Sequence, residues 1–446
     1  MIKSQFTLMV PIDDEPDKYV LFNTRTQALI AVNSDVKNVL EKQIFDEDDF
    51  NGCCDVMRAL LDNGLIVKDK QEDKSKIEAF FEQVETQSDI MPFEITLLTT
   101  LSCNFKCSYC FEEGVKKSIF LDTDKCDMVL KWIDNQVSKH LYKKLHITFY
   151  GGEPLLNKDA IDYVASRMNS YAIKNKIRFT FGMITNGYLL NANDVDRWIK
   201  LGLHGIRVTV DGDKESHDAR RPLVNGGDTF GVIIKNIESI IDKKINISVT
   251  GNYDSTNVAN IISLLDFFEK KNLLGKFERV GFTPLLPRFG KIDKAGDMEL
   301  REYFDDHNKF SNDINMLIRR ELLARNVKVP SGLGYMACSL LSRHNGVVID
   351  PEGQIYKCPV MVGYPQFAVG NIDDYEYNQV FDDFIAIRAW KKCDQNCPYL
   401  PTCNGGCRFL SYVQNGNFDE LWCERECIDA VATDLILADY KQARDF

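Results

Sequence analysis

The sequence predicts an α/β protein with a parallel sheet, preceded by a small N-terminal module and followed by a cysteine-rich region. Three observations predict this architecture. Short β-branched or aromatic runs alternate with helical-period segments through the middle of the chain, a charged stretch separates the beginning from the middle, and most cysteines gather near the end. Strand runs that alternate with helical patterns of about 10–15 residues indicate βα units.

The composition excludes several classes of protein. Of the 446 residues 44% are hydrophobic and 27% charged, which is enough for large cores and unlike a disordered chain. The net charge of -12 argues against sequence-independent nucleic-acid binding, which needs a basic surface. No apolar run approaches the roughly 18 residues that span a bilayer, and the start of the chain lacks a signal-peptide pattern. We therefore expect a cytoplasmic protein with no nucleic-acid or membrane partner.

Residues 1–75 read as a separate small module. The pattern predicts three strands, a helix capped by Ser34, a second helix that ends at Asn63-Gly64, and a returning strand. These elements are Phe6–Val10, Tyr19–Phe22, Ala28–Val32, the helix after Ser34, Cys54–Leu61 and Leu65–Val67. The charged stretch Lys68–Lys76 is the expected boundary.

The middle of the chain, at 90–320, carries six strand-like runs with helical segments between them. The runs are Phe93–Leu98, His146–Tyr150, Arg178–Phe181, Ile206–Val210, Ile245–Val249 and Val280–Thr283. Six strands are too few for a full eight-unit barrel, so a partial barrel and a doubly wound sheet both fit.

The 14 cysteines divide into three groups by position. Three stand at Cys103, Cys107 and Cys110, eight lie from 338 to 427, and the remaining three are Cys53, Cys54 and Cys126. In a reduced compartment, clustered cysteines indicate metal more often than disulfides. The remaining three have no partners at metal-ligand spacing, and we expect them to pack within helices.

The first group has the spacing C-x3-C-x2-C directly after the first strand. Three thiolates on a short loop can hold three irons of a 4Fe–4S cluster and leave one iron open for another ligand. A zinc loop and buried core cysteines are the alternatives.

This loop resembles the signature of the radical S-adenosylmethionine (SAM) superfamily, including the aromatic residue before Cys110. Gly151-Gly152-Glu153-Pro154 resembles the GGEP motif that receives the methionine amino group, and Thr185-Asn186-Gly187 and Thr209-Val210-Asp211-Gly212 fit the same pattern. The resemblance implies a SAM cluster on the cysteine triplet. It implies SAM contacts from Gly151, Gly152, Glu153, Asn186, Thr209 and Arg221. No catalytic residue beyond the cluster is assigned, and His217 is expected to brace its loop.

The C-terminal cysteines, in a region at 330–446, resemble those of the SPASM domain, which holds two auxiliary 4Fe–4S clusters; a zinc ribbon is the alternative. By resemblance the first cluster takes Cys338, Cys358 and Cys407, with its fourth ligand open, and the second takes Cys393, Cys397, Cys403 and Cys423. Cys427 has no clear role. The sequence has C-x3-C at Cys393–Cys397 where the family usually has C-x2-C. Asp350–Tyr356 reads as a hairpin turn that delivers Cys358.

Taken together, the resemblance implies a partial (β/α)6 TIM barrel with a winged-helix-like α+β module before it and an iron–sulfur SPASM domain after it. The implied cofactors are SAM and three 4Fe–4S clusters. The implied activity is that of a peptide maturase that abstracts hydrogen from a ribosomally made precursor and installs a crosslink, with a thioether expected first. A precursor leader held by the N-terminal module and an electron donor such as flavodoxin or ferredoxin are the expected partners.

Two other functions remain open at this point. A formylglycine-forming anaerobic sulfatase maturase is disfavoured because Pro359, not an aspartate, follows Cys358. A non-catalytic iron–sulfur or zinc protein would not need the SAM motifs.

Overall fold

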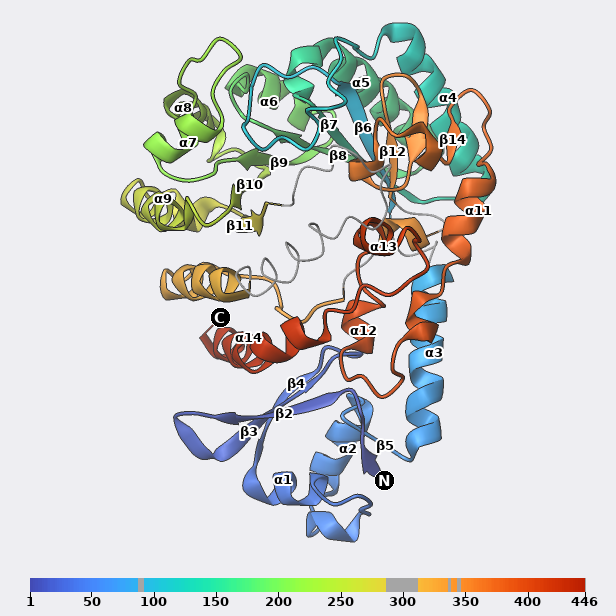
Figure 1. Cartoon of the computed structure of the whole chain (residues 1–446), viewed down its shortest axis with the longest axis vertical. Helices are drawn as coiled ribbons and strands as arrows, with labels where there is room; N and C mark the ends of the chain where they lie inside the picture. Colours follow the sequence, from blue (N-terminus) through green and yellow to red (C-terminus); the bar gives the residue numbers. More distant parts are fainter. Residues whose placement is uncertain (87–91, 286–311, 336–337, 343–345, 446) are drawn as a thin grey trace.

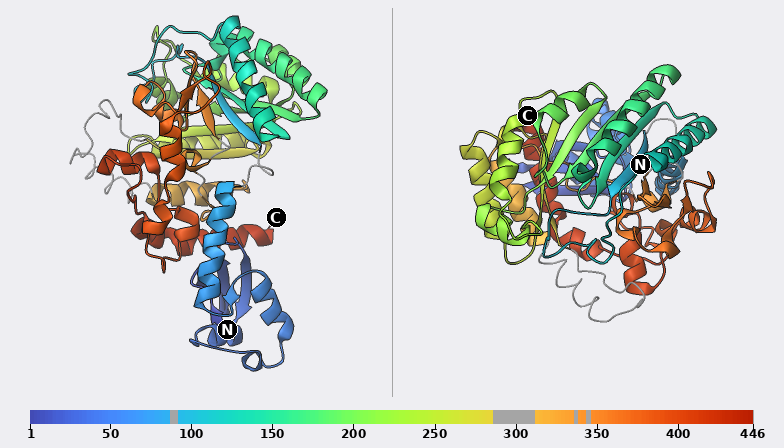
Figure 2. Two further views of the ribbon diagram at one scale, coloured as in Figure 1. Left: turned by 90° about the vertical axis from the view of Figure 1, so that its right-hand side faces the viewer. Right: turned by 90° about the horizontal axis from the view of Figure 1, so that it is seen from above.

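The computed structural model describes residues 1–86, 92–285, 312–335, 338–342 and 346–445. The molecule is elongated, with the N-terminal module at one end, the α/β body at the other and much of the C-terminal region between them (Figures 1 and 2). Of the body expected at 90–320, residues 90–91 and 286–311 lie outside the described part.

Six parallel strands form the centre of the body in chain order. They are β6 (Phe93–Thr100), β7 (Lys144–Gly151), β8 (Arg178–Thr185), β9 (Leu203–Thr209), β10 (Asn246–Tyr253) and β11 (Arg279–Pro284). Each predicted strand overlaps one of these, so the α/β fold and the parallel order are confirmed.

The C-terminal region extends this sheet beyond β6. Strand β12 (Val347–Ile349) pairs parallel with β6, and β13 (Gln354–Tyr356) and β14 (Gly370–Asn371) follow antiparallel. The predicted hairpin is therefore β12–β13. Among the described residues the sheet has 9 strands in the order β11-β10-β9-β8-β7-β6-β12-β13-β14, and it crosses the limit expected near residue 330.

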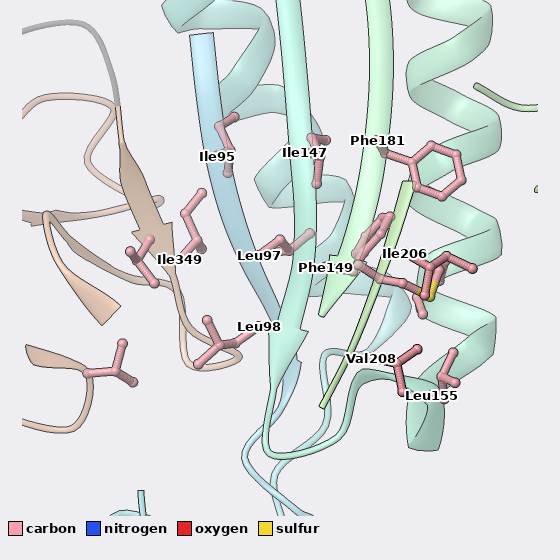
Figure 3. Close-up of a cluster of buried hydrophobic side chains, with 14 of the residues drawn as sticks. Ile95, Leu97, Leu98, Ile147, Phe149, Leu155, Phe181, Ile206, Val208 and Ile349 are labelled. Carbon is pink, nitrogen blue, oxygen red and sulfur yellow. The ribbon is translucent and has the colours of Figure 1, made fainter. Parts of the chain in front are cut away.

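One face of the six strands is the main hydrophobic core. Side chains such as Ile147, Phe149 and Phe181 are fully buried on it, because alternate strand residues project to the same face (Figure 3). The helices that cover this face are α4 (Thr123–His140), α5 (Lys158–Asn175), α6 (Ala192–Ile199), α7 (Lys214–Arg220), α8 (Phe230–Ile240) and α9 (Val258–Lys270). The opposite face lines a cavity, so the arrangement is that of a partial barrel and not of a doubly wound sheet, whose two faces both carry helices.

The N-terminal module contains an antiparallel sheet in the order β2-β3-β4. The first and last strands of the module form a second, two-stranded antiparallel sheet. The elements of the module are β1 (Ile2–Lys3), β2 (Thr7–Ile12), β3 (Glu15–Asn23), β4 (Leu29–Asn33), α1 (Ser34–Leu40), α2 (Cys54–Asp62) and β5 (Ile66–Val67).

Two details of the module differ from the prediction. The cap of α1 is Asn33, whose Oδ1 accepts from the Val36 amide at 3.1 Å; the Ser34 hydroxyl donates instead to the Asp17 carbonyl. Cys53 is exposed at the start of α2 rather than packed inside, whereas Cys126 is buried as expected. The hydroxyl and amide side chains at 33 and 34 both suit a cap, so sequence alone could not choose between them.

The charged stretch expected as a boundary lies largely within α3 (Lys70–Thr86). This helix runs alongside the molecule and packs onto the C-terminal region, where Phe81 stacks on Trp390 with ring centroids 4.7 Å apart (Figure 1). Helix α14 (Arg425–Asp445) closes a second core against the module, in which Val10 and Phe22 meet Ile436. The module is therefore joined to the chain's C-terminal part by two apolar clusters.

The remaining helices surround the C-terminal cysteines. They are α11 (Gln379–Ala386), α12 (Leu400–Cys403) and α13 (Arg408–Asn415); residues 312–324 are also helical. No helix in the described part of the chain is both long and apolar enough to cross a membrane.

Candidate active site

A cavity of about 490 Å³ opens at the C-terminal ends of the six parallel strands. Every strand from β6 to β11 contributes lining residues, and the cysteine loop after β6 and the segment after Cys358 complete the wall. The three cysteines Cys103, Cys107 and Cys110 lie on this wall, as do five of the six predicted SAM contacts. Strand ends are where barrel architecture collects catalytic groups.

The cysteine loop is held on two sides by backbone hydrogen bonds. On one side Lys106 and Ser108 donate to the carbonyls of Pro222 and Arg220, and on the other side Gly152 and Glu153 donate to the carbonyls of Thr100 and Ser102. This clamp fixes the direction of the three thiols without using their sulfur atoms.

Burial raises the pKa of Cys103 to about 12, opposed by the Phe105 amide, which donates to its sulfur at 3.4 Å. Such a thiol stays protonated until a metal replaces its proton. In the described residues no three His, Cys, Asp or Glu side chains converge closely enough for a single metal ion. The donor chemistry of three adjacent thiols on one loop fits a three-cysteine iron–sulfur cluster.

The two glycines of the GGEP motif are required by the cysteine loop itself. A Cβ on Gly151 would lie 2.2 Å from the Thr100 carbonyl oxygen, and one on Gly152 would lie 2.3 Å from the Ser102 carbonyl oxygen. Gly151 also has a φ of +131°, which disfavours other residues. These glycines therefore let the two turns pack together as well as approach a ligand.

Glu153 is fully buried behind the cavity wall rather than on it. Its carboxylate accepts from the Asn186 amide at 2.7 Å, from the Thr185 hydroxyl at 2.7 Å and from the Leu155 amide at 3.0 Å. The structure thus shows Glu153 joining the end of β7 to the end of β8. Asn186 lies on the wall, and its Nδ2 donates to Asn104 Oδ1 at 2.8 Å and lies 4.0 Å from the Cys103 sulfur.

Arg221 anchors a buried polar network beneath the cysteine loop. Its Nη1 donates to the Tyr109 hydroxyl at 2.5 Å and lies 3.8 Å from Asp211 Oδ2, and the Tyr109 hydroxyl in turn donates to Asp211. The Asn252 Nδ2 also donates to Tyr109, at 3.3 Å. The Nε–H of Arg221 is buried without a partner among the described residues. An unpaired buried donor on the cavity wall fits a ligand with a carboxylate, such as SAM.

His217 braces the network, as the sequence suggested. It is fully buried, and its Nδ1 accepts from the Asp211 amide at 3.2 Å. Burial, and then the charge of Arg221, lower the pKa of His217 to about 4, so its imidazole is neutral at pH 7.

The electrostatic interactions among the C-terminal cysteines follow the grouping expected from the sequence, and the ligand sets of the two auxiliary clusters stay predictions. Burial, and then the charges of Cys338 and Cys407, raise the pKa of Cys358 to about 12. Burial, and then the charges of Cys397 and Cys423, raise the pKa of Cys393 to about 11. Cys338 and Cys407 are therefore each close enough to Cys358 to affect the pKa of its thiol.

The second group also includes Cys403, whose pKa is raised to about 12 by burial, by Glu424 and by Cys393. Cys427 lies in the first turn of α14, and its backbone carbonyl accepts from Asn312 at 2.8 Å.

Arg408 lies fully buried between the two cysteine groups. Burial lowers its pKa, and Cys338 and Cys407 of one group and Cys393 and Cys403 of the other raise it. Its guanidinium donates to the backbone carbonyls of Gly405, Gly406, Phe418 and Glu420, and it makes no ion pair among the described residues. Anionic thiolates on both sides would supply the missing counter-charge.

Three groups at the cavity were not predicted from the sequence to line it. Asn252 and Arg207 face the cavity from the strands, and Pro359 reaches it from the C-terminal region. The position of Asn252 near the end of a parallel strand is a signal that could have identified it. The position of Arg207 at the cavity depends on strand register, and that of Pro359 depends on packing between distant parts of the chain.

Comparison with known proteins identifies a family and several proteins of similar sequence. Residues 97–267 match the family described as the radical SAM superfamily. The cysteine-type anaerobic sulfatase-maturating enzyme of Clostridium novyi (strain NT) is 24% identical over 361 residues, which is 72% of this chain and 90% of that protein. The radical SAM cyclopropyl synthase TigE of Paramaledivibacter caminithermalis is 23% identical over 464 residues, which is 94% of this chain and 91% of that protein.

Solved structures share the fold. A sulfatase-maturating enzyme, anSMEcpe with bound AdoMet, superposes with a TM-score of 0.61 at 20% identity, covering 79% of this chain and 98% of that one. SuiB of Streptococcus suis bound to its precursor peptide SuiA gives 0.52 at 14% identity, covering 95% of this chain and 99% of that one.

Proposed function

Because this chain is a radical SAM enzyme, we propose that it modifies a ribosomally made precursor peptide, with a thioether crosslink as the product. SAM binds in the cavity at the strand ends, and the alternative of a non-catalytic iron–sulfur or zinc protein is set aside. Under this proposal Cys103, Cys107 and Cys110 hold the SAM cluster, and the two C-terminal cysteine groups hold auxiliary clusters.

When bound, such a cluster supplies the electron that cleaves SAM into methionine and a 5′-deoxyadenosyl radical. The chain's own residues then have three tasks. Arg221 offers its unpaired Nε–H to the SAM carboxylate, Asn186 and Thr209 present polar groups to the same ligand, and the strand walls exclude water from the reacting peptide. Formation of a thioether removes two hydrogens from the peptide: one leaves as a hydrogen atom to the 5′-deoxyadenosyl radical and one as the thiol proton. The two C-terminal cysteine groups would hold the clusters that could accept the remaining electron.

The observation that carries a peptide substrate is a groove in the N-terminal module. It has a volume of about 370 Å³ and lies between β4, α1 and α2. Strand β4 is the edge of its sheet, so one side of its backbone can pair with an added strand. The floor is apolar, with Val32, Phe50 and Leu60, and Asp35 and Asp49 stand among its lining residues. These features suit an extended leader with apolar side chains and a basic residue, and they support a winged-helix-like recognition role.

The sulfatase-maturase alternative is less well supported. The resemblance places a catalytic aspartate directly after the auxiliary-cluster cysteine, but here Pro359 occupies that position and lines the cavity. The alignment to TigE also spans more of this chain than the alignment to the C. novyi enzyme does.

The proposed reaction is tested by coexpression with the short peptides encoded next to this chain, followed by anoxic assay with SAM and a reductant. We expect 5′-deoxyadenosine and a peptide lighter by about 2 Da, the mass of the two hydrogens lost in a crosslink. Deuterium uptake without mass loss would contradict a crosslink in favour of epimerisation. Absence of 5′-deoxyadenosine would contradict the radical chemistry itself.

If the leader binds in this groove, a bulky side chain placed there should strongly weaken leader binding. Ala59 is an exposed lining residue on α2, and Ala59→Trp places an indole in the groove. We expect leader affinity, measured by fluorescence anisotropy, to fall by at least about tenfold, or about 1.4 kcal/mol. The matched control is Arg58→Trp on the solvent side of the same helix, where the arginine does not line the groove. Equal affinities for the two variants would show that the leader binds elsewhere.

A further inference from the structure

Two arginines share the inner face of the barrel. Arg207 of β9 and Arg279 of β11 are both in register with Ser248 of β10. Residues in register on neighbouring strands project to the same face, and the flanking Val208 and Val280 are buried on the opposite face against the helices. Both guanidinium groups therefore belong to the inner face, and Arg207 lines the cavity.

Neither arginine has an acidic partner in the part of the chain that the structure describes. Among the described residues no ion pair and no side-chain hydrogen bond involves Arg207 or Arg279, whereas surface arginines such as Arg197 and Arg325 are paired with carboxylates. Partial burial, and then the like charge of Arg279, lower the pKa of Arg207; the Tyr150 hydroxyl acts in the opposite direction. Both arginines are exposed side chains, and in a chain with a net charge of -12 two like-charged guanidinium groups on one face of the barrel form a local positive site that attracts an anion.

The other charged groups that the structure describes on the cavity wall do not pair with the two arginines. Glu112 and Lys116 stand by the cysteine loop, where Lys116 pairs with Glu113 at 2.8 Å, and no ion pair between Glu112 and either arginine occurs among the described residues. Arg221 is already engaged with Tyr109 and Asp211.

Arg207 also lies deeper than the expected SAM contacts. It precedes Thr209 by two residues on the same face of β9, which places it about 6–7 Å further from the strand end. Thr209 and the cysteine triplet mark the end of the cavity where SAM is expected to bind. Along β9, Arg207 lies further from the cysteine loop than Thr209 does.

We infer that Arg207, assisted by Arg279, binds a carboxylate of the peptide substrate and so selects the residue that is modified. A planar guanidinium pairs with a carboxylate through two parallel hydrogen bonds, which fixes the orientation as well as the charge. The carboxylate belongs to an Asp or Glu side chain or to the peptide's C-terminus. This inference rests on the proposed function and deepens it by naming the substrate class.

The test measures binding of small peptides to the cluster-loaded, SAM-bound enzyme by ligand-detected NMR under anoxia. The probes are acetyl-Gly-Xaa-Gly-amide with Xaa as Asp, Glu, Asn or Gln, and acetyl-Gly-Gly-Gly with either a free or an amidated C-terminus. The last pair separates a terminal carboxylate from a side-chain carboxylate. We expect the carboxylate probe of one set to bind about tenfold more tightly than its amide, and Arg207→Gln to remove that difference.

Two controls keep the inference distinct from other roles. Arg178→Gln makes the same change at the first residue of β8, outside the cavity, and should preserve the preference for the carboxylate probe over its amide. The SAM affinity of Arg207→Gln should stay within about twofold of the wild type. A loss of SAM affinity as large as the loss of peptide affinity would assign Arg207 to SAM, and equal binding of acid and amide probes by the wild type would overturn the inference. Failure of the wild type to form 5′-deoxyadenosine would instead count against the proposed function, because probe binding does not require turnover.

Discussion

Cys107→Ala abolishes 5′-deoxyadenosine formation from SAM, while Cys126→Ala retains it. We expect the first variant to lose at least about a thousandfold in rate, because two thiols cannot retain the cluster that delivers the electron. Cys126 is also a buried cysteine, but it lies on the buried side of α4 and does not line the cavity. Anoxic assay by chromatography measures the product, and iron analysis measures cluster content.

The iron content separates this result from simple misfolding. Cys107→Ala should lose about four irons per chain and keep those of the auxiliary clusters, since their cysteines lie elsewhere in the fold. Substantial SAM cleavage by Cys107→Ala would contradict the assignment of the triplet. A loss of all iron would show that the variant had not folded, and Cys103→Ser would then replace it.

Arg221→Leu lowers SAM affinity by about a hundredfold and destabilises the protein. The change removes the donor offered to the SAM carboxylate and leaves Asp211, which is fully buried, without its cation. Breaking a buried charge pair costs about 3 kcal/mol, and a charge-assisted hydrogen bond to a ligand contributes a similar amount. Equilibrium dialysis with labelled SAM measures the affinity, and denaturant unfolding measures the stability.

The neighbouring Arg220 provides the matched control. Its ion pair with Asp254, at 3.0 Å, is partly exposed and contributes no more than about 1 kcal/mol. Arg220→Leu should therefore bind SAM within about threefold of the wild type. If Arg220→Leu and Arg221→Leu reduced SAM affinity equally, the effect would come from loss of the loop and not from a direct contact. Arg221→Lys, which keeps the charge but not the planar fork, should fall between Arg221→Leu and the wild type.

Local spacing predicted which residues gather at the cavity more accurately than it predicted where helix α1 of the N-terminal module begins. The cysteine loop, the glycine turn and Arg221 each lie close to a strand or helix end that the sequence pattern identifies, so their convergence follows from parallel topology. The helix cap at Asn33 instead of Ser34 is a one-residue error between two equally suitable side chains.

Features that depend on contacts between distant parts of the chain could not be predicted in this way. Helix α3 reads as a charged boundary because it buries few side chains, among them Ile77 and Phe81, and those meet a partner about 300 residues later in the sequence. Arg207 reads as an ordinary strand residue until the register with β10 shows which face it occupies. Arg408 likewise gains its meaning only when both cysteine groups are placed around it.

The apolar cluster between the N-terminal module and α14 has a consequence for biosynthesis. Val10 and Phe22 leave the ribosome long before Ile436, yet all three belong to one core. The sheet of the module therefore waits for the C-terminal helix before it is fully covered, and during that interval its apolar face is open to chaperones or to a leader peptide. N-terminal-first folding, which is common in multidomain proteins, is not available to this core. We expect a nascent chain arrested before α14 to be protease-sensitive in residues 7–23, and release of the helix to protect them.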